Sequence, residues 1–388
     1  MLRFPKNFLW GTAMAAHQVE GNNTHNDWWY LEQKGLTEKS GEACDYYHRF
    51  KEDHCLIEDL NNNAFRFSIE WSRIEPEEGS WNEKEIEHYR ALIQDLKKRN
   101  LEVFIGLHHF TTPLWLYKKG GMAVQKAPFY FARFAEKVAK EYGGLVDFWI
   151  TINEPLIYAH ILGKEPFHQN LLKRLLVIFR LIKAHKLAYI KIKETLGIKT
   201  KVGLVKNNIY FEPTRKFFLD KALVRVVDYF FNKWFLNQIK NYLDFIGLNY
   251  YFHNLVSFPF RKTYKIERDT YQATSDMGWE IYPEGIYHVL KGLKRYKKPI
   301  YVTENGLADA FDKKRIKFIK DHLRFVHQAI QEGVDVRGYF HWSLMDNFEW
   351  RNGFGPRFGL YEVDYATQER KPRPSSYVYA KICHDNGV

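Results

Sequence analysis

Short apolar runs that end in polar or aromatic residues recur along the whole chain. Eight runs share this format: Asn7–Thr12, Ala64–Ile69, Leu101–His108, Val146–Ile152, Lys201–Asn207, Asp244–Tyr250, Pro299–Glu304 and Val336–Trp342. A continuous apolar run of this length is typical of a strand that is buried on both faces, as in a parallel sheet. The pattern therefore predicts eight buried strands.

Longer segments with apolar residues at helical spacing lie between most of these runs. They predict helices over Glu83–Arg99, Phe129–Tyr142, Leu171–Glu194, Tyr282–Arg295 and Lys313–Glu332. Strands that alternate with helices indicate βαβ units and a parallel sheet. Because no linker or composition break interrupts the alternation, we predict one (β/α)8 barrel, a single catalytic domain of residues 1–388. A doubly wound open sheet is the alternative, but it normally has a Gly-rich first turn, which is absent.

Two of the predicted strands end in a glutamate. Glu304 is followed by Asn305-Gly306, and Glu154 is followed by Pro155. Taken alone, Glu304 is equally compatible with an ordinary helix start. The second glutamate favours chemistry, because the active sites of barrels form at the C-terminal ends of strands and two carboxyl groups hydrolyse a glycosidic bond. Strands four and seven are three apart among eight, so we expect the two carboxyl groups to face each other.

The remaining strand ends carry amide, imidazole, guanidinium and aromatic side chains. These include Gln18, Arg66, His108, His109, Asn153, Asn249, Tyr251, His341, Trp342, Glu349 and Trp350. Adjacent residues of a strand point to opposite faces, so only one of His108 and His109 can enter a pocket. We interpret His341 as a core or supporting residue, and Glu20, Glu70 and Asp346 as ion-pair or loop-anchoring residues.

Six segments, in chain order, carry a family resemblance. They are Phe8-Leu-Trp-Gly-Thr-Ala, Phe65-Arg-Phe-Ser-Ile-Glu-Trp-Ser-Arg-Ile, Thr151-Ile-Asn-Glu-Pro, Asp244-Phe-Ile-Gly-Leu-Asn-Tyr-Tyr, Val302-Thr-Glu-Asn-Gly and Trp342-Ser-Leu-Met-Asp-Asn-Phe-Glu-Trp. With these motifs the sequence resembles glycoside hydrolase family 1, the β-glucosidase family of retaining enzymes. The resemblance implies an exo-acting β-glycosidase that hydrolyses β-glucosides, with β-galactosides or β-fucosides as further substrates. It implies a covalent glycosyl-enzyme intermediate and neither cofactor nor metal.

The resemblance also implies a role for each site residue. Glu304 is expected to be the nucleophile and Glu154 the acid/base, with a raised pKa caused by apolar surroundings and by Glu304. The other residues would bind the sugar or support the nucleophile: Gln18, His109 and Glu349 at the outer hydroxyls, Asn153 at the 2-hydroxyl, Trp342 and Trp350 as stacking surfaces, Asn249 in the pocket wall, and Arg66 and Tyr251 beside the nucleophile.

The chain departs from the family pattern at one residue, which loses an indole N–H donor, and in three loops that normally build the wall beyond the cleaved bond. Phe110 stands where the family usually has Trp, and three loops are short: Leu162–Pro166, Val226–Leu243 and Ala308–Asp312. The sugar site is thus expected to be complete, and the aglycone site reduced.

Two rival functions remain. In a 6-phospho-β-glycosidase, the carboxylate of Glu349 would repel the phosphate. A catalytically weak sugar-binding relative would be expected to lack one of the two glutamates, and this chain keeps both.

The net charge of +12 raises the question of anionic partners. Ten Lys and Arg against two Glu lie between Lys164 and Lys201, a stretch that includes the amphipathic segment Leu171–Lys193. We interpret this segment as a barrel helix with a solvated basic face and expect neither membrane nor nucleic acid as a partner. Three cysteines without a CxxC pair, and an N-terminus without an apolar signal region, lead us to expect a cytoplasmic protein.

Overall fold

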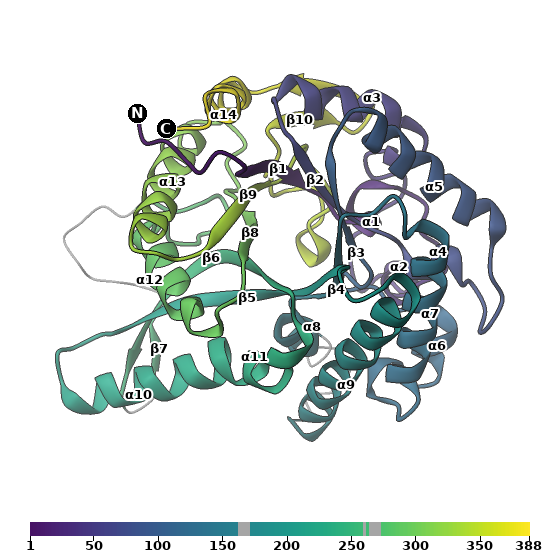
Figure 1. Cartoon of the computed structure of the whole chain (residues 1–388), viewed down its shortest axis with the longest axis horizontal. Helices are drawn as coiled ribbons and strands as arrows, with labels where there is room; N and C mark the ends of the chain where they lie inside the picture. Colours follow the sequence, from purple (N-terminus) through teal and green to yellow (C-terminus); the bar gives the residue numbers. More distant parts are fainter. Residues whose placement is uncertain (162–170, 259–260, 264–272) are drawn as a thin grey trace.

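A closed barrel of eight parallel strands forms the centre of the protein (Figure 1). The computed structural model describes residues 1–161, 171–258, 261–263 and 273–388. The barrel strands are β1 (Leu9–Ala13), β2 (Ala64–Ser68), β3 (Glu102–Gly106), β4 (Phe148–Asn153), β5 (Lys201–Pro213), β6 (Phe245–Ser257), β8 (Ile300–Asn305) and β9 (Val336–Trp342). Parallel pairing of β1 with β9 and of β5 with β6 completes the ring. The predicted (β/α)8 barrel is confirmed.

Helices on the outside of the barrel connect successive strands (Figure 1). The longer ones are α3 (Tyr46–Asp59), α5 (Glu83–Lys98), α7 (Ala127–Tyr142), α9 (Leu171–Leu196), α10 (Phe218–Asp228), α12 (Glu284–Leu293), α13 (Arg315–Gln331) and α14 (Pro374–Asp385). The five predicted helices correspond to α5, α7, α9, α12 and α13. Among the helices of the described residues, none combines the length and apolar character needed to cross a bilayer.

Aromatic rings fill the interior of the barrel. The rings of Phe104 and Phe148 stack at 3.9 Å, and Phe245, Tyr301 and Phe340 pack around them. Such rings bury a large apolar area each, so they close the barrel below the active site. Part of the high aromatic content of the sequence is thus explained by the core.

Strands β5 and β6 continue well past the barrel. Their pairing runs from Gly203 with Phe245 to Pro213 with Val256, with a register shift after Asn207. The predicted ends at Asn207 and Tyr250 were wrong, because the outer half is a partly exposed ribbon that lacks a continuous apolar run. A short strand, β7 (Arg261–Thr263), adds to its edge.

Of the three loops that are short in the sequence, two lie within the described residues. Leu162–Pro166 lies outside the described residues. The segment before β6 folds into α10, a turn of π-helix η2 (Tyr229–Lys233) and α11 (Trp234–Ile239). Ala308–Asp312 is a short link into α13. After β9 the chain forms a hairpin of β10 (Tyr361–Asp364) and β11 (Glu369–Pro372) before α14.

Candidate active site

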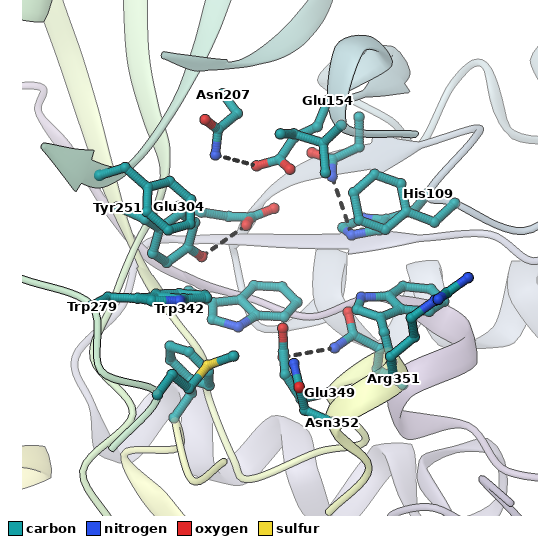
Figure 2. Close-up of a pocket in the computed structure, with 18 of the residues that line it drawn as sticks. His109, Glu154, Asn207, Tyr251, Trp279, Glu304, Trp342, Glu349, Arg351 and Asn352 are labelled. Atoms are coloured by element: carbon teal, nitrogen blue, oxygen red, sulfur yellow. Dashed lines mark hydrogen bonds between the residues drawn. The ribbon is translucent and has the colours of Figure 1, made fainter. Parts of the chain in front are cut away.

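A cavity of about 240 Å³ lies at the C-terminal ends of the barrel strands. Figure 2 shows Glu154 and Glu304 on one side of it, Trp342 across its middle and Glu349 on the far side. The sequence-predicted residues that line it are Gln18, His109, Asn153, Glu154, Tyr251, Glu304, Trp342, Glu349 and Trp350. Arg66 and Asn249 do not line it, but they bond to the residues that do. The structure thus brings the whole predicted set together.

Glu304, near the end of β8, is held by donors from two other strands. Its Oε1 accepts a hydrogen bond from Arg66 Nη1 at 2.5 Å, and its Oε2 accepts one from the Tyr251 hydroxyl at 2.9 Å. Burial, with the Glu304 charge as a further cause, raises the pKa of Tyr251 well above its usual value, so the phenol keeps its proton and donates. One carboxylate is therefore oriented at both oxygens and faces a cation.

Glu154 follows β4 and has different surroundings. Its Oε1 accepts hydrogen bonds from Asn249 Nδ2 at 2.7 Å and Asn207 Nδ2 at 3.2 Å. Burial raises the pKa of Glu154 to about 7, and the charge of Glu304 is the second cause. The two amides and the ammonium of Lys206 act in the opposite direction. This carboxyl group can hold a proton near neutral pH, as the sequence analysis expected.

The backbone of Glu154 is in the left-handed region, with φ of 47°. This conformation is uncommon for a residue with a side chain and costs on the order of 1–3 kcal/mol. A hydrogen bond from the Glu154 amide to the Val205 carbonyl, at 2.9 Å, helps to fix it. The sharp turn takes Glu154 out of the strand direction and into the pocket.

Asn153 joins the two glutamates through a continuous polar network. Its Oδ1 accepts from Arg66 Nη2 at 2.7 Å and from Asn249 Nδ2 at 3.3 Å. Its Nδ2 lies 3.2 Å from His109 Nε2. Burial, with Arg66 as a further cause, lowers the pKa of His109 well below its usual value, so the ring is neutral and can accept this bond.

A second polar group lies across Trp342 from the glutamate pair. Gln18 Nε2 donates to the Phe348 carbonyl at 2.8 Å and to Glu349 Oε2 at 3.2 Å. Burial raises the pKa of Glu349 to about 8, and Glu304 is the second cause. Gln18 Oε1 is buried and has no protein partner, so it is an acceptor that a ligand can use.

Two indole rings form apolar surfaces beside these polar groups. The His109 ring lies 6.1 Å from Trp342 and 6.1 Å from Trp350, with interplanar angles of 23° and 17°. Phe110, which replaces the usual Trp, packs 5.2 Å from Trp350 and lines the cavity. Its own ring has no polar atom, so this part of the wall lacks the donor that an indole would provide.

The sequence analysis missed several lining residues. Asn207 ends the barrel part of β5 and bonds to Glu154; the rule of polar residues at strand ends would have found it. Trp279 and Met277 lie in an irregular segment before α12, where no periodic pattern marks them. Trp28 comes from α2 (Asp27–Gln33), another element that the pattern did not predict.

The residues expected to be structural lie outside the pocket. His108 is buried with its ring edge-on to Tyr158, and His341 is buried near Tyr379. Glu20 pairs with Arg73 at 3.0 Å, while Glu70 accepts hydrogen bonds from Ser72 and Thr111. In the part of the chain that the structure describes, no group of three or more His, Cys, Asp or Glu side chains is placed to hold a metal ion.

Comparisons with known proteins identify the family of this chain. The model of glycosyl hydrolase family 1 matches residues 1–241 and 236–388. Beta-glucosidase A of Thermotoga maritima is 36% identical over 444 aligned positions, which cover 100% of this chain and 99% of the relative. A beta-galactosidase of Pyrococcus woesei is 30% identical, with 99% and 98% covered. Because 388 residues span these alignments, the relatives contain internal segments that this chain lacks.

Solved structures give the same result. A beta-glycosidase from Pyrococcus horikoshii has a TM-score of 0.93 at 42% identity, with 100% of this chain and 96% of that chain covered. A beta-glucosidase from Thermotoga maritima in complex with glucoimidazole has a TM-score of 0.93 at 35% identity, with 100% of both chains covered. The family model and these relatives span the chain from end to end. The protein belongs to glycosyl hydrolase family 1.

Proposed function

We propose that the protein is a retaining, exo-acting β-glycosidase whose single catalytic domain spans residues 1–388. The pair of glutamates in opposed surroundings is the observation that carries this proposal. Glu304 faces a cation and a phenol, while Glu154 is buried among amides and has a pKa raised to about 7. Two carboxyl groups in such different surroundings at one cavity match the requirement for one nucleophile and one acid/base.

In the first step, the ionised carboxylate of Glu304 attacks the anomeric carbon while Glu154 gives its proton to the leaving oxygen. The glycosyl-enzyme ester removes the negative charge of Glu304, which is one cause of the raised pKa of Glu154. Without that charge the pKa of Glu154 is lower, so the carboxylate that has just given up its proton stays ionised and can act as base. In the second step, it takes a proton from water, which attacks the ester and releases the sugar with the β configuration.

The substrate class follows from the far side of the cavity. Gln18 and Glu349 offer acceptors for outer sugar hydroxyls, and Trp342 offers an apolar face to the sugar ring. We propose a β-glucoside as the preferred substrate, with β-galactosides and β-fucosides also cleaved. The names of the relatives, which include beta-glucosidase and beta-galactosidase, support this range.

Hydrolysis of 6-phosphorylated glycosides is the rival within this fold. A phosphate at this end of the sugar would meet the buried carboxyl group of Glu349. Beside a phosphate dianion this group must either stay protonated or form an unfavourable buried contact between like charges, a restriction that a neutral sugar hydroxyl does not impose.

A substrate comparison tests the proposal. Purified protein is incubated with aryl β-glucoside, β-galactoside and β-fucoside, and with the 6-phosphorylated β-glucoside, and the released phenol is measured. We expect turnover of the neutral sugars and none of the phosphorylated one. Faster turnover of the phosphorylated substrate, or no turnover of any substrate, would overturn the assignment.

Three free cysteines, of which Cys55 is exposed, support a cytoplasmic location.

A further inference from the structure

Helix α9 exposes a stripe of large apolar side chains over its first turns. Leu171, Leu172, Leu175, Leu176 and Phe179 are exposed at helical spacing, and Leu172 reaches 74%. The buried residues of this helix begin only at Val177. The first two turns of α9 thus present Leu side chains to solvent, in addition to the basic residues that the sequence analysis expected there.

The helical run α10–η2 presents a second stripe. Phe218, Val226, Tyr229 and Phe230 are exposed, and Phe218 reaches 68%. The one buried residue of α10 is Asp220, which bonds to Arg215 and to the Phe258 amide. Leu219, Leu223, Val224 and Val227 are half-buried, so the protein covers only part of the apolar surface of α10 and leaves Phe218 and Val226 exposed.

The two stripes are linked through Trp234, the first residue of α11. The Phe179 ring lies 5.8 Å from the Trp234 ring, edge to face, and α11, which follows η2, contacts α9. In Figure 1, α9, α11 and α10 follow one another along the lower edge of the barrel. We call the exposed apolar residues of α9 and of α10–η2, taken together, the α9–α10 patch. Isolated exposed apolar residues are ordinary, whereas many large apolar side chains exposed on neighbouring helices indicate a binding surface.

Exposed cations surround the patch. Lys173 lies within the α9 stripe, and no acidic residue occurs from Leu171 to Lys193. Lys216, Lys221 and Arg225 are exposed beside the α10 stripe. The two acidic residues of that helix are engaged by cations, Asp220 by Arg215 and Asp228 by Lys233. The partner that complements this surface is both apolar and anionic.

This charge pattern distinguishes between possible occupants. A two-fold contact between copies places the same cations of both chains against each other, which is unfavourable. Side chains that project from a basic helix surface match the headgroup boundary of a membrane.

We propose that the α9–α10 patch docks the protein on the surface of an anionic lipid bilayer. The Leu and Phe side chains enter the boundary between headgroups and acyl chains, and the surrounding Lys and Arg lie at the level of the lipid phosphates. The association is peripheral and uses no spanning helix. It differs from the expectation of no membrane partner, which rested on the sequence pattern alone.

Vesicle flotation tests this proposal. Wild-type protein is mixed with phosphatidylglycerol vesicles or phosphatidylcholine vesicles, and the floated fraction is measured at about 0.1 M and about 1 M salt. We expect binding to phosphatidylglycerol only, weakened at high salt. The double variant Leu172→Gln/Phe218→Gln should lower the partition coefficient about tenfold or more, because two exposed side chains no longer enter the apolar layer. Lys173→Gln/Lys221→Gln should weaken binding and its salt dependence.

Matched controls distinguish vesicle binding through the patch from nonspecific adsorption by other exposed apolar residues. Ile198→Gln/Phe311→Gln removes two equally exposed apolar residues outside the patch, 79% and 81% exposed, and should leave binding unchanged. All variants should keep wild-type turnover of a soluble aryl β-glucoside. The proposal fails if wild type does not float, or if only the Lys variant loses binding, which indicates charge adsorption alone. It also fails if sedimentation shows a dimer that the Leu172→Gln/Phe218→Gln variant dissociates, with no vesicle binding.

Discussion

At the scale of single residues, the proposed acid step depends on the pKa of Glu154. Burial and the charge of Glu304 raise the pKa of Glu154 to about 7. An acid catalyst must be protonated, so kcat/KM for a substrate with a poor leaving group should be high below pH 7 and fall as the pH rises through about 7. A pH–rate profile of an alkyl β-glucoside measures this. A profile that stays flat to pH 9 would contradict the assignment of Glu154.

Lys206, on β5, provides a sharper test of the same pKa. Its ammonium is buried, lies 4.4 Å from the Phe231 ring centroid, and lowers the pKa of Glu154. Burial lowers its own pKa to about 7, so it carries part of a charge at neutral pH. Lys206→Met should therefore shift the basic limb of the pH profile upward, by less than about one unit. Lys206→Arg, which keeps the cation, and the exposed Lys201→Met are the controls.

Glu349 illustrates how function opposes stability. Its pKa is raised to about 8 in the folded state, so the folded protein favours the protonated form and the ionised form destabilises the fold. This destabilisation is absent below about pH 4.5 and grows as the pH rises towards 8. Glu349→Gln should therefore raise the free energy of unfolding at pH 7, on the order of 1 kcal/mol, with little effect at pH 4. Denaturation at the two pH values measures this, and KM for the glucoside should rise.

At the scale of elements, the barrel strands could be predicted because they are buried on both faces and read as continuous apolar runs. Helix α3 could not, since only Tyr46, Phe50, Asp53, His54 and Ile57 of its residues are buried and two of these are charged or polar. The outer halves of β5 and β6 lack the buried pattern because they face solvent on part of their surface. The site residues at strand ends could be predicted. Trp279 could not, because it lies in an irregular segment before α12.

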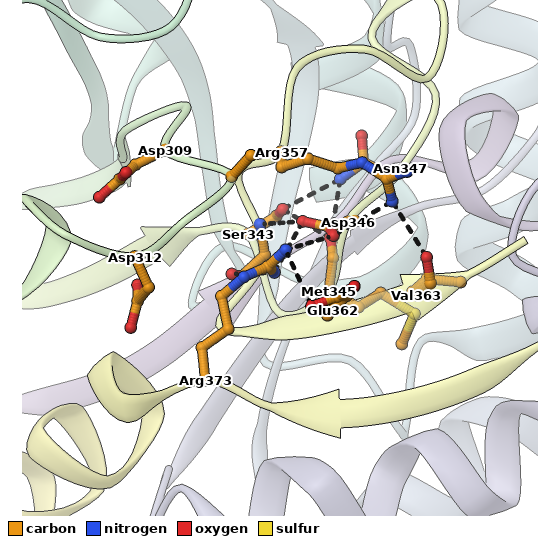
Figure 3. A network of polar contacts seen from close by, with 12 residues as sticks. Asp309, Asp312, Ser343, Met345, Asp346, Asn347, Arg357, Glu362, Val363 and Arg373 are labelled. Carbon is orange, nitrogen blue, oxygen red and sulfur yellow. Dashed lines mark hydrogen bonds and ion pairs between the residues drawn. The ribbon is translucent and has the colours of Figure 1, made fainter.

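The loop after β9 is positioned by a buried ion-pair network. Asp346 accepts hydrogen bonds from Arg373 Nη2 at 2.8 Å, from Arg357 Nη1 at 3.3 Å and from the Gly359 amide at 2.9 Å. Figure 3 shows the two arginines approaching Asp346 from different sides. Glu349 follows Asp346 by three residues, so this network, in place of regular secondary structure, holds the far side of the sugar site.

Arg373→Met should show how much the network contributes. It leaves the buried charge of Asp346 with one weaker cation, which should lower the free energy of unfolding by about 3–5 kcal/mol. KM should rise more than kcat falls, because Glu349 shifts while the glutamate pair stays in place. Arg337→Met, which removes an exposed pair with Asp335, should cost less than about 1 kcal/mol. Equal losses in the two variants would show that the network does not position the loop.

At the scale of the whole molecule, one barrel collects side chains from strands that are far apart in the sequence. Arg66 of β2, Asn153 of β4 and Tyr251 of β6 converge on Glu304 of β8 directly or through one another. The motifs and the strand count were sufficient to predict this convergence. They were not sufficient to predict that apolar side chains in the first turns of α9 and on α10 are exposed, because an amphipathic pattern does not show which apolar positions the core covers.

The central claim is that Glu304 is the nucleophile and Glu154 the acid/base of a retaining reaction. The most direct measurement is the anomer formed when azide rescues each alanine variant, determined by NMR. Glu304→Ala opens the face that the nucleophile occupied, so azide should attack there and give the α-glycosyl azide. Glu154→Ala, with a dinitrophenyl β-glucoside, still forms the ester on Glu304, so azide should give the β-glycosyl azide. An α-azide from Glu154→Ala, or a β-azide from Glu304→Ala, would mean that the two roles are reversed.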